Sequence, residues 1–140
     1  MRPASRQHGF SLFELLIVLL LLATAAGVAA PSVGRFLDQL AFRRETGEVL
    51  AQLRAAKLEA ISTGRAVLVS NEESGLRLSS GGREPRIVTL TTRLAVQFEP
   101  PQITFYPEGL ATPAAIRLER GRRRMDFTID PLTGLPERAS

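Results

Sequence analysis

The chain has 140 residues, a length that fits one small domain with a long helix and argues against a second hydrophobic core. It contains no cysteine, so a disulfide framework, a thiolate metal site and thiol catalysis are excluded. Its formal net charge of +4 is too weak a surplus to imply a partner by itself.

Residues 10–30 are the most apolar part of the chain and read FSLFELLIVLLLLATAAGVAA. At about 1.5 Å per residue they would make a helix of roughly 30 Å, which matches the hydrocarbon core of a bilayer. Arg2 and Arg6 precede this run, and positive residues tend to stay in the cytoplasm. We therefore predict a transmembrane helix over 10–30, with the N-terminus cytoplasmic and everything after Pro31 across the membrane. A secretory signal cleaved within 23–30 is the alternative.

Glu14 lies inside this apolar run, where an ionisable side chain is costly and is normally kept only when it has a partner. The predicted helix contains no basic residue that could be that partner. A cut between Gly9 and Phe10 would create a cationic α-amino group and would make Glu14 the fifth residue of the shortened chain. The alternative is a carboxylate near the membrane surface that reaches water without any partner.

The run at 9–16 resembles the cleavage and methylation motif of type IV pilins and of type II secretion pseudopilins. The resemblance implies a leader peptide over 1–9, cleavage by a prepilin peptidase after Gly9, N-methylation of Phe10 and a role for Glu14 in assembly. In a low dielectric, the Glu14 carboxylate of one subunit would strongly attract the terminal ammonium of its neighbour. Burial of the two ions would then depend on assembly.

Residues 31–64 are predicted to continue the helix, with a kink where Pro31 and Gly34 interrupt it. In the type IV pilin family, a proline that bends the helix commonly stands where Pro31 does. An amphipathic pattern gives this stretch one broad face of small and apolar residues: Leu40, Gly47, Leu50, Leu53, Ala56, Ala60 and Ile61. Its charged surface consists of Arg43, Arg44, Glu45, Glu48, Arg54 and Glu59. Gly64 follows the last periodic residues and is predicted to form a left-handed C-terminal cap.

Residues 65–140 read as short strands separated by turn signals, with no helix among them. The predicted strands are 66–70, 76–79, 86–90, 95–98, 103–105, 116–119 and 125–129. Strands spaced so closely form antiparallel pairs, and the amphipathic helix needs a sheet to cover its apolar face. The sequence thus predicts an α+β fold in which a long N-terminal helix packs on antiparallel β-sheet structure.

Three short runs of this region resemble the H-type minor pseudopilins of type II secretion and their relatives among minor pilins, the GspH/FimT-like proteins. They lie at 55–64, 103–109 and 129–134, and Lys57 stands where family members often carry arginine. The resemblance implies a minor pseudopilin, a structural subunit of the periplasmic pseudopilus of a type II secretion system, held in the inner membrane with its C-terminal domain in the periplasm. A minor type IV pilin with a role in pilus biogenesis or DNA uptake is the alternative. The implied partners are other pseudopilins or pilins, the prepilin peptidase and the inner-membrane assembly platform.

Side chains that could carry catalysis or hold a metal are scarce. The only histidine, His8, lies in the predicted leader, which excludes a histidine-based triad or metal cluster from the processed chain. Asp126 and Asp130 are four residues apart on a predicted strand and could hold a hard cation. A turn at 130–134, in which Asp130 bonds local backbone amides, is the simpler interpretation. We predict no enzymatic activity, no metal site and no cofactor.

Five arginines gather around Gly121, namely Arg117, Arg120, Arg122, Arg123 and Arg124. A Gly-Arg-x-Arg element occurs in minor pilins that bind DNA, and Gly121, Arg122 and Arg124 fit its spacing. Guanidinium groups so close together could contact several phosphates, although no aromatic residue lies among them to stack on bases. The alternative is a solvated hairpin tip that resists edge pairing or meets an acidic neighbour.

Overall fold

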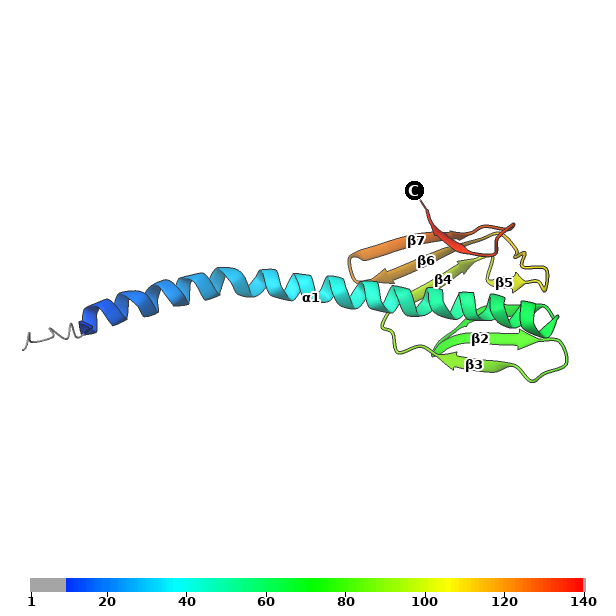
Figure 1. Ribbon diagram of the computed structural model, residues 1–140, viewed down its shortest axis with the longest axis horizontal. Helices are drawn as coiled ribbons and strands as arrows, with labels where there is room; N and C mark the ends of the chain where they lie inside the picture. The colour runs from blue at the N-terminus through cyan, green and yellow to red at the C-terminus, as the bar shows by residue number, and fades with distance from the viewer. Residues whose placement is uncertain (1–9, 140) are drawn as a thin grey trace, which may run out of the picture. The chain divides into compact units, whose positions relative to one another are not determined.

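The computed structural model describes residues 10–139, and for residues 28–32 it describes the backbone but not the side chains. The described part contains one helix, α1 (Leu12–Thr63), followed by eight strands (Figure 1). The strands are β1 (Val67–Glu72), β2 (Gly75–Ser80), β3 (Arg86–Thr89), β4 (Ala95–Glu99), β5 (Gln102–Phe105), β6 (Ala114–Arg120), β7 (Arg123–Ile129) and β8 (Pro136–Arg138). The chain forms two compact units, one up to Leu40 and one from Ala41 onward, and each is described by itself.

Helix α1 has a cap at each end. At its start the Phe13 N–H donates to the Ser11 Oγ at 3.3 Å, which is how an N-cap side chain accepts. At its end Gly64 has a φ of 63°, and the Arg65 N–H donates to the Ala60 carbonyl at 3.3 Å. This pair of features is a Schellman cap, so the left-handed cap predicted at Gly64 is confirmed.

The first unit is the N-terminal part of α1. The backbone stays helical through Pro31 and Gly34. The Pro31 side chain lies outside the described residues, so the bend expected there stays a prediction. No helix in the described part of the chain is long and apolar enough to cross a membrane. The transmembrane segment over 10–30 likewise stays a prediction.

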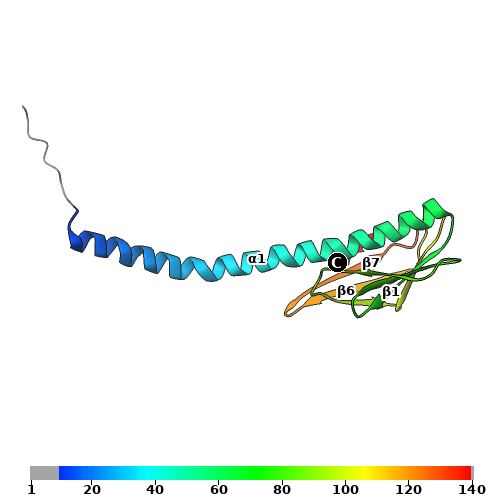
Figure 2. The same cartoon turned by 90° about the horizontal axis from the view of Figure 1, so that it is seen from below.

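In the second unit, α1 lies along one side of the strands (Figure 2). It buries a narrow stripe of side chains there. The buried side chains are Phe42, Thr46, Val49, Leu50, Leu53, Ala56 and Ala60. The prediction that Gly47 and Ile61 share this face is wrong, because both are exposed, and Leu40, which is also exposed, belongs to the first unit. The observed stripe advances by alternating steps of four and three residues. The polar Thr46 within it concealed this pattern in the sequence.

The strands form two four-stranded sheets, one in the order β3-β2-β1-β5 and the other in the order β4-β6-β7-β8. Every pair is antiparallel, and each predicted strand overlaps one of β1 to β7. The predicted α+β fold, with a helix packed on antiparallel sheets, is therefore confirmed. The sequence missed β8, which has three residues, begins with Pro136 and pairs with the end of β7. So short a strand carries no alternating pattern to detect.

The hydrophobic core contains residues from α1 and from both sheets. Alternate residues of a strand point into it, as Val67 and Val69 of β1 do. Leu53, near the middle of the buried α1 stripe, is fully buried. Every buried hydrophobic residue in the described part of the chain lies between residues 42 and 129, so the second unit holds the whole of this core.

Candidate assembly sites

The predicted processing site lies at the start of α1. Phe10 precedes the helix, and its side chain is 80% exposed. Glu14 lies in the first turn, three residues after the N-cap Ser11, where the positive end of the helix dipole favours a carboxylate. Among the described residues the Glu14 carboxylate has no ion pair, and its role in assembly stays a prediction. Gly9 and the leader 1–9 lie outside the described residues, so cleavage and methylation stay predictions.

The runs that carry the subfamily resemblance meet at one place in the second unit. Lys57 of α1 donates from Nζ to the Thr133 carbonyl at 2.6 Å. The Ala111 N–H donates to the Pro131 carbonyl at 3.0 Å, which joins the segment after β5 to the turn after β7. A lysine at position 57 is thus sufficient to bind this turn, although family members often carry arginine there. Segments far apart in the sequence therefore build one structural element.

Gly134 allows the turn after β7 to lie close to the turn after β5. Gly134 has a φ of 60°, and a Cβ added there would stand 2.8 Å from the Gly109 carbonyl oxygen. Gly109 also has a positive φ, of 88°. Because the clash at Gly134 would be with backbone and not with a flexible side chain, any larger residue would push the two turns apart.

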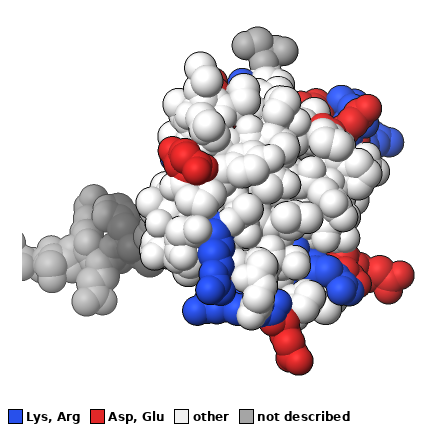
Figure 3. Space-filling model, turned by 90° about the vertical axis from the view of Figure 1, so that its right-hand side faces the viewer, with Lys and Arg blue, Asp and Glu red and all other residues white. Residues whose placement is uncertain are grey.

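The turn after β7 is held by hydrogen bonds of its own and presents a leucine. Asp130 Oδ1 accepts from the Leu132 N–H at 2.8 Å, and the Gly134 N–H donates to the Asp130 carbonyl at 2.7 Å. Asp130 therefore acts as a turn residue. Leu132 is 78% exposed. Figure 3 views this end of the unit, where uncharged residues cover the centre and charged side chains lie toward the border.

Carboxylates engage most of the arginines around the β6–β7 turn. Arg124 Nε lies 2.7 Å from Asp126 Oδ2, and Arg117 Nε lies 3.2 Å from Oδ1 of the same carboxylate. The hydrogen bond from Arg124 is the main cause that lowers the pKa of Asp126 below its ordinary value of 3.8, and it also raises the pKa of Arg124. Asp126 is thus committed to two guanidinium groups. Among the described residues, no three side chains of metal-ligating type form a group.

Glu45 joins α1 to two other parts of the second unit. Its Oε1 accepts from Arg120 Nη1 at 2.7 Å. Its Oε2 accepts from Thr92 Oγ1 at 3.1 Å and from the Arg93 N–H at 3.3 Å. The side chain is only 16% exposed, so the prediction that it forms part of the charged helix surface is wrong. Its partners Thr92 and Arg120 lie 47 and 75 residues away, a distance that no local pattern reports.

Arg122 differs from its neighbours because it is exposed and has no ion pair with any described residue. It occupies the second position of the two-residue loop between β6 and β7, and only Gly121 of that loop has a positive φ, of 58°. This is the type II′ pattern, which fixes the direction of the loop. Of the two arginines in the Gly-Arg-x-Arg element, Arg122 is open and Arg124 is paired. Fewer guanidinium groups are therefore available to phosphates than the sequence suggested.

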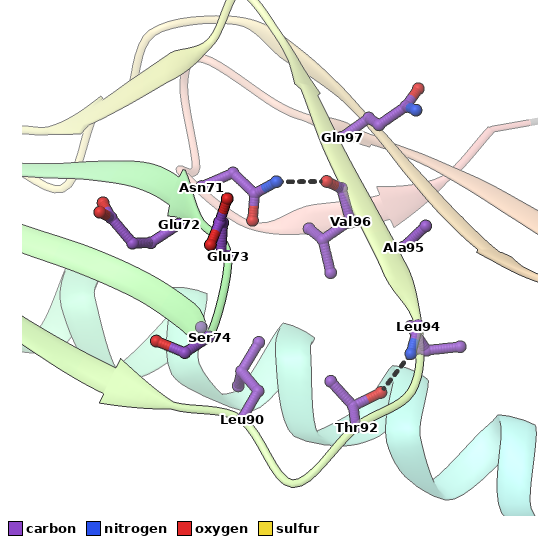
Figure 4. Close-up of a pocket in the computed structure, with 11 residues that line it drawn as sticks. Asn71, Glu72, Glu73, Ser74, Leu90, Thr92, Leu94, Ala95, Val96 and Gln97 are labelled. Atoms are coloured by element: carbon purple, nitrogen blue, oxygen red, sulfur yellow. Dashed lines mark hydrogen bonds between the residues drawn. The ribbon is translucent and has the colours of Figure 1, made fainter.

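A groove of about 540 Å³ opens between the β1–β2 turn and β4. Figure 4 shows Glu73, Leu90 and Val96 pointing into it. Asn71 Nδ2 donates to the Val96 carbonyl at 2.6 Å across the gap. The groove was not predicted, because its walls come from two separate segments of the chain, residues 71–75 and 90–97.

Comparison with known families identifies the globular part. Residues 45–133 match the family model described as type II transport protein GspH, which is more than half of the chain. The chain belongs to this family. The GspH region includes both Glu45 and the contact between Lys57 and Thr133, and the subfamily resemblance is confirmed. Residues 4–30 match the model of the prokaryotic N-terminal methylation motif, which indicates a membrane-anchored protein of the prepilin type.

Two solved structures have a similar fold. Two crystal forms of the type IV minor pilin FimU from Pseudomonas aeruginosa strain PAO1 resemble the chain, both at 16% identity. One covers 75% of this chain and 92% of FimU with a TM-score of 0.57, and the other covers 70% and 92% with a TM-score of 0.54. No curated protein matches the chain in sequence. The fold is pilin-like, and membership of the GspH family makes this a minor subunit of the pilin or pseudopilin type that assembles with other such subunits.

Proposed function

We propose that the chain is a minor pseudopilin of a type II secretion system, a structural, non-enzymatic subunit of the periplasmic pseudopilus. The observation that supports this most is the GspH-family match over residues 45–133. The matched region follows a methylation motif over residues 4–30, so one chain combines a segment of the prepilin type with the family's globular domain.

The proposed topology follows from the charge and apolarity of the N-terminal region. Residues 10–30 would span the inner membrane with Arg2 and Arg6 in the cytoplasm, and residues 65–140 would lie in the periplasm. Alkaline phosphatase, which folds only outside the cytoplasm, reports this directly when fused after Ala139. An active fusion supports the topology, and an inactive but intact fusion contradicts it.

Assembly is proposed to depend on Glu14. The prepilin peptidase would remove residues 1–9 and methylate Phe10, and the new terminal ammonium would offer the carboxylate of a neighbouring subunit its partner. An ion pair withdrawn from water in this way is favourable only when both charges are present. The other pseudopilins and the inner-membrane assembly platform are the proposed partners in this step.

The test is deletion of the gene in its own host, followed by complementation. With the wild-type chain restored, we expect secreted enzymes to return from the periplasm to the culture medium. Glu14→Gln, which keeps the size of the side chain and removes its charge, is expected to leave the protein in the membrane without restoring secretion. Normal secretion by the deletion strain would contradict the proposed function.

A minor type IV pilin is the second candidate, favoured by the likeness in fold to FimU, which is a type IV minor pilin. The same deletion strain separates the two candidates. Loss of surface pili and of surface motility, with secretion intact, would favour the pilus. A role in DNA uptake has less support, because Arg117, Arg120 and Arg124 are engaged by carboxylates.

A further inference from the structure

Strand β4 is an edge strand of its sheet. It ends the order β4-β6-β7-β8, so within the described part of the chain only its side toward β6 is paired with a strand. Natural proteins commonly protect such an edge with lysine, proline or a bulge. The five residues of β4 include neither lysine nor proline, and their register with β6 is uninterrupted. This edge is therefore able to accept a further strand.

The contact made by Asn71 shows which backbone groups lie on the free side of β4. The Val96 carbonyl accepts from Asn71 Nδ2 at 2.6 Å, so it points toward β1 and away from β6 (Figure 4). The backbone groups of an antiparallel strand alternate between its two sides. Phe98 therefore directs its N–H and C=O to the same side as Val96, whereas those of Gln97 face β6. One side-chain amide thus occupies a position that a neighbouring strand would fill in a continuous sheet.

The side of β1 that faces β4 is open at the same place. Strand β1 has six residues, and β5 pairs only with the first four, Val67 to Ser70. Beyond them a groove of about 540 Å³ separates the end of β1 and the β1–β2 turn from β4. A hollow of about 440 Å³ continues it along β4 as far as Phe98 and Pro101. We call the groove and this hollow together the β4 groove, which follows the free edge of the strand.

The lining of the β4 groove indicates what it would bind. Leu90 and Val96 supply apolar walls, and the Glu73 carboxylate lies at its edge without an ion pair to any described residue (Figure 4). The other charged lining residue, Glu72, is also acidic and is held by Arg77 at 2.7 Å. None of the described residues that line the groove is basic. The complementary occupant is an extended segment with apolar side chains and a lysine or arginine.

We propose that the β4 groove binds an extended basic segment of a different protein, which adds a strand to the free edge of β4 and places a lysine or arginine on Glu73. Main-chain hydrogen bonds to Val96 and Phe98 supply affinity, and the apolar walls and Glu73 select the side chains. The incoming backbone replaces the Asn71 amide at the Val96 carbonyl. The identity of the partner as another pilin-type subunit rests on the proposed function; the charge and shape of the groove do not.

The test uses the full chain in micelles of an uncharged detergent and a fluorescent hexapeptide of alternating lysine and valine, with binding followed by fluorescence anisotropy. We expect saturable binding. Glu73→Arg is expected to weaken it by about fivefold or more, because an attraction becomes a repulsion. The same peptide N-methylated at every residue cannot donate main-chain hydrogen bonds and is expected to bind about tenfold or more weakly.

Glu108→Arg is the matched control for charge, because Glu108 is an exposed carboxylate outside the groove, and it is expected to leave binding unchanged. Glu73 is itself exposed in the β1–β2 turn, so its substitution is expected to leave the fold intact, which circular dichroism checks.

Three results would each overturn the proposal: no binding to the wild-type chain, equal binding to Glu73→Arg, or equal binding of the N-methylated peptide. Binding that is lost in Glu73→Arg and on N-methylation, and is kept in Glu108→Arg, supports it. Peptide binding and secretion are measured independently. A chain that restores secretion without binding the peptide therefore contradicts this proposal alone.

Discussion

The two units of the chain differ most in what their apolar side chains contact. In the first unit every side chain that the structure describes is exposed, and Leu12 and Leu19 are 83% and 57% exposed. In the second unit Leu53 and Ile103 are fully buried in a core drawn from the helix and both sheets. One continuous helix thus serves two environments. Its second part is stabilised by its own domain, whereas its first part needs a bilayer or neighbouring helices to cover its leucines.

The largest effect is expected from removing a core side chain on the second unit's part of α1. Leu53→Ala is expected to lower the free energy of unfolding by about 2–5 kcal/mol, because the cavity left behind closes only partly. Denaturant unfolding followed by circular dichroism measures it. Leu58→Ala, at a residue that is 64% exposed, is the control and should change stability by less than about 0.5 kcal/mol. Equal effects at both positions would contradict the observed buried face.

Substitution of a glycine tests the place where the runs at 55–64, 103–109 and 129–134 meet. Gly134→Ala places a Cβ 2.8 Å from the Gly109 carbonyl oxygen at a residue with a φ of 60°. We expect a loss of about 1–3 kcal/mol in the free energy of unfolding. Gly81→Ala, where no atom lies within 4 Å of the added Cβ and φ is not positive, should be close to neutral. A neutral Gly134→Ala would show that the turns are not in contact as described.

Glu14 and Glu45 are carboxylates of α1 that lie in different units, and neutralising each of them should affect the stability of the second unit differently. Glu45→Gln removes charge-assisted hydrogen bonds to Arg120 and to the β3–β4 loop and is expected to cost about 1 kcal/mol of stability. Glu14→Gln, in the first unit, is expected to leave unfolding of the second unit unchanged. Thermal unfolding of the two variants side by side measures the difference. An unchanged melting temperature for Glu45→Gln would mean that this carboxylate does not hold the loop and the hairpin to the helix.

The smallest expected effect is on acid stability. The folded pKa of Asp126 is held below its ordinary value of 3.8, chiefly by the hydrogen bond from Arg124. A depressed folded pKa adds stability above the unfolded pKa, and that stability is lost as the pH falls below about 3.8 toward the folded value. Asp126→Asn should therefore flatten the acid limb of a plot of melting temperature against pH. A steeper acid limb in the variant would contradict the assignment.

Local signals predicted a large part of the fold. Gly64 ended α1 as expected, and turn residues such as Gly81 and Pro100 separated strands close to their observed limits. These features depend on a few adjacent residues, so the sequence reports them directly. The predicted buried face of α1 differs from the observed one because Thr46 is polar and yet only 5% exposed. Burial at this position is decided by the sheets that cover it.

The candidate sites likewise include some that consist of adjacent residues, which the sequence reports, and some that form between separate segments, which it does not. The processing motif at 9–16 could be read from adjacent residues, and its family match agrees with that reading. The Glu45 contacts, the Lys57 contact at a separation of 76 residues and the groove between the β1–β2 turn and β4 arise only when separate segments meet. Ion pairs with Asp126 and Glu45 also leave fewer arginines of the cluster available to phosphates than the sequence suggested, because the sequence shows the charges but not their partners.

Processing after Gly9 is the central event proposed for this chain, and the intact mass of the protein from membranes of its own host tests it most directly. Mass spectrometry would compare strains with and without the prepilin peptidase. We expect a chain that lacks residues 1–9 and carries one added methyl group, and we expect both changes to require the peptidase. An uncut chain, or one cut within the alanine-rich segment 23–30, would contradict this expectation.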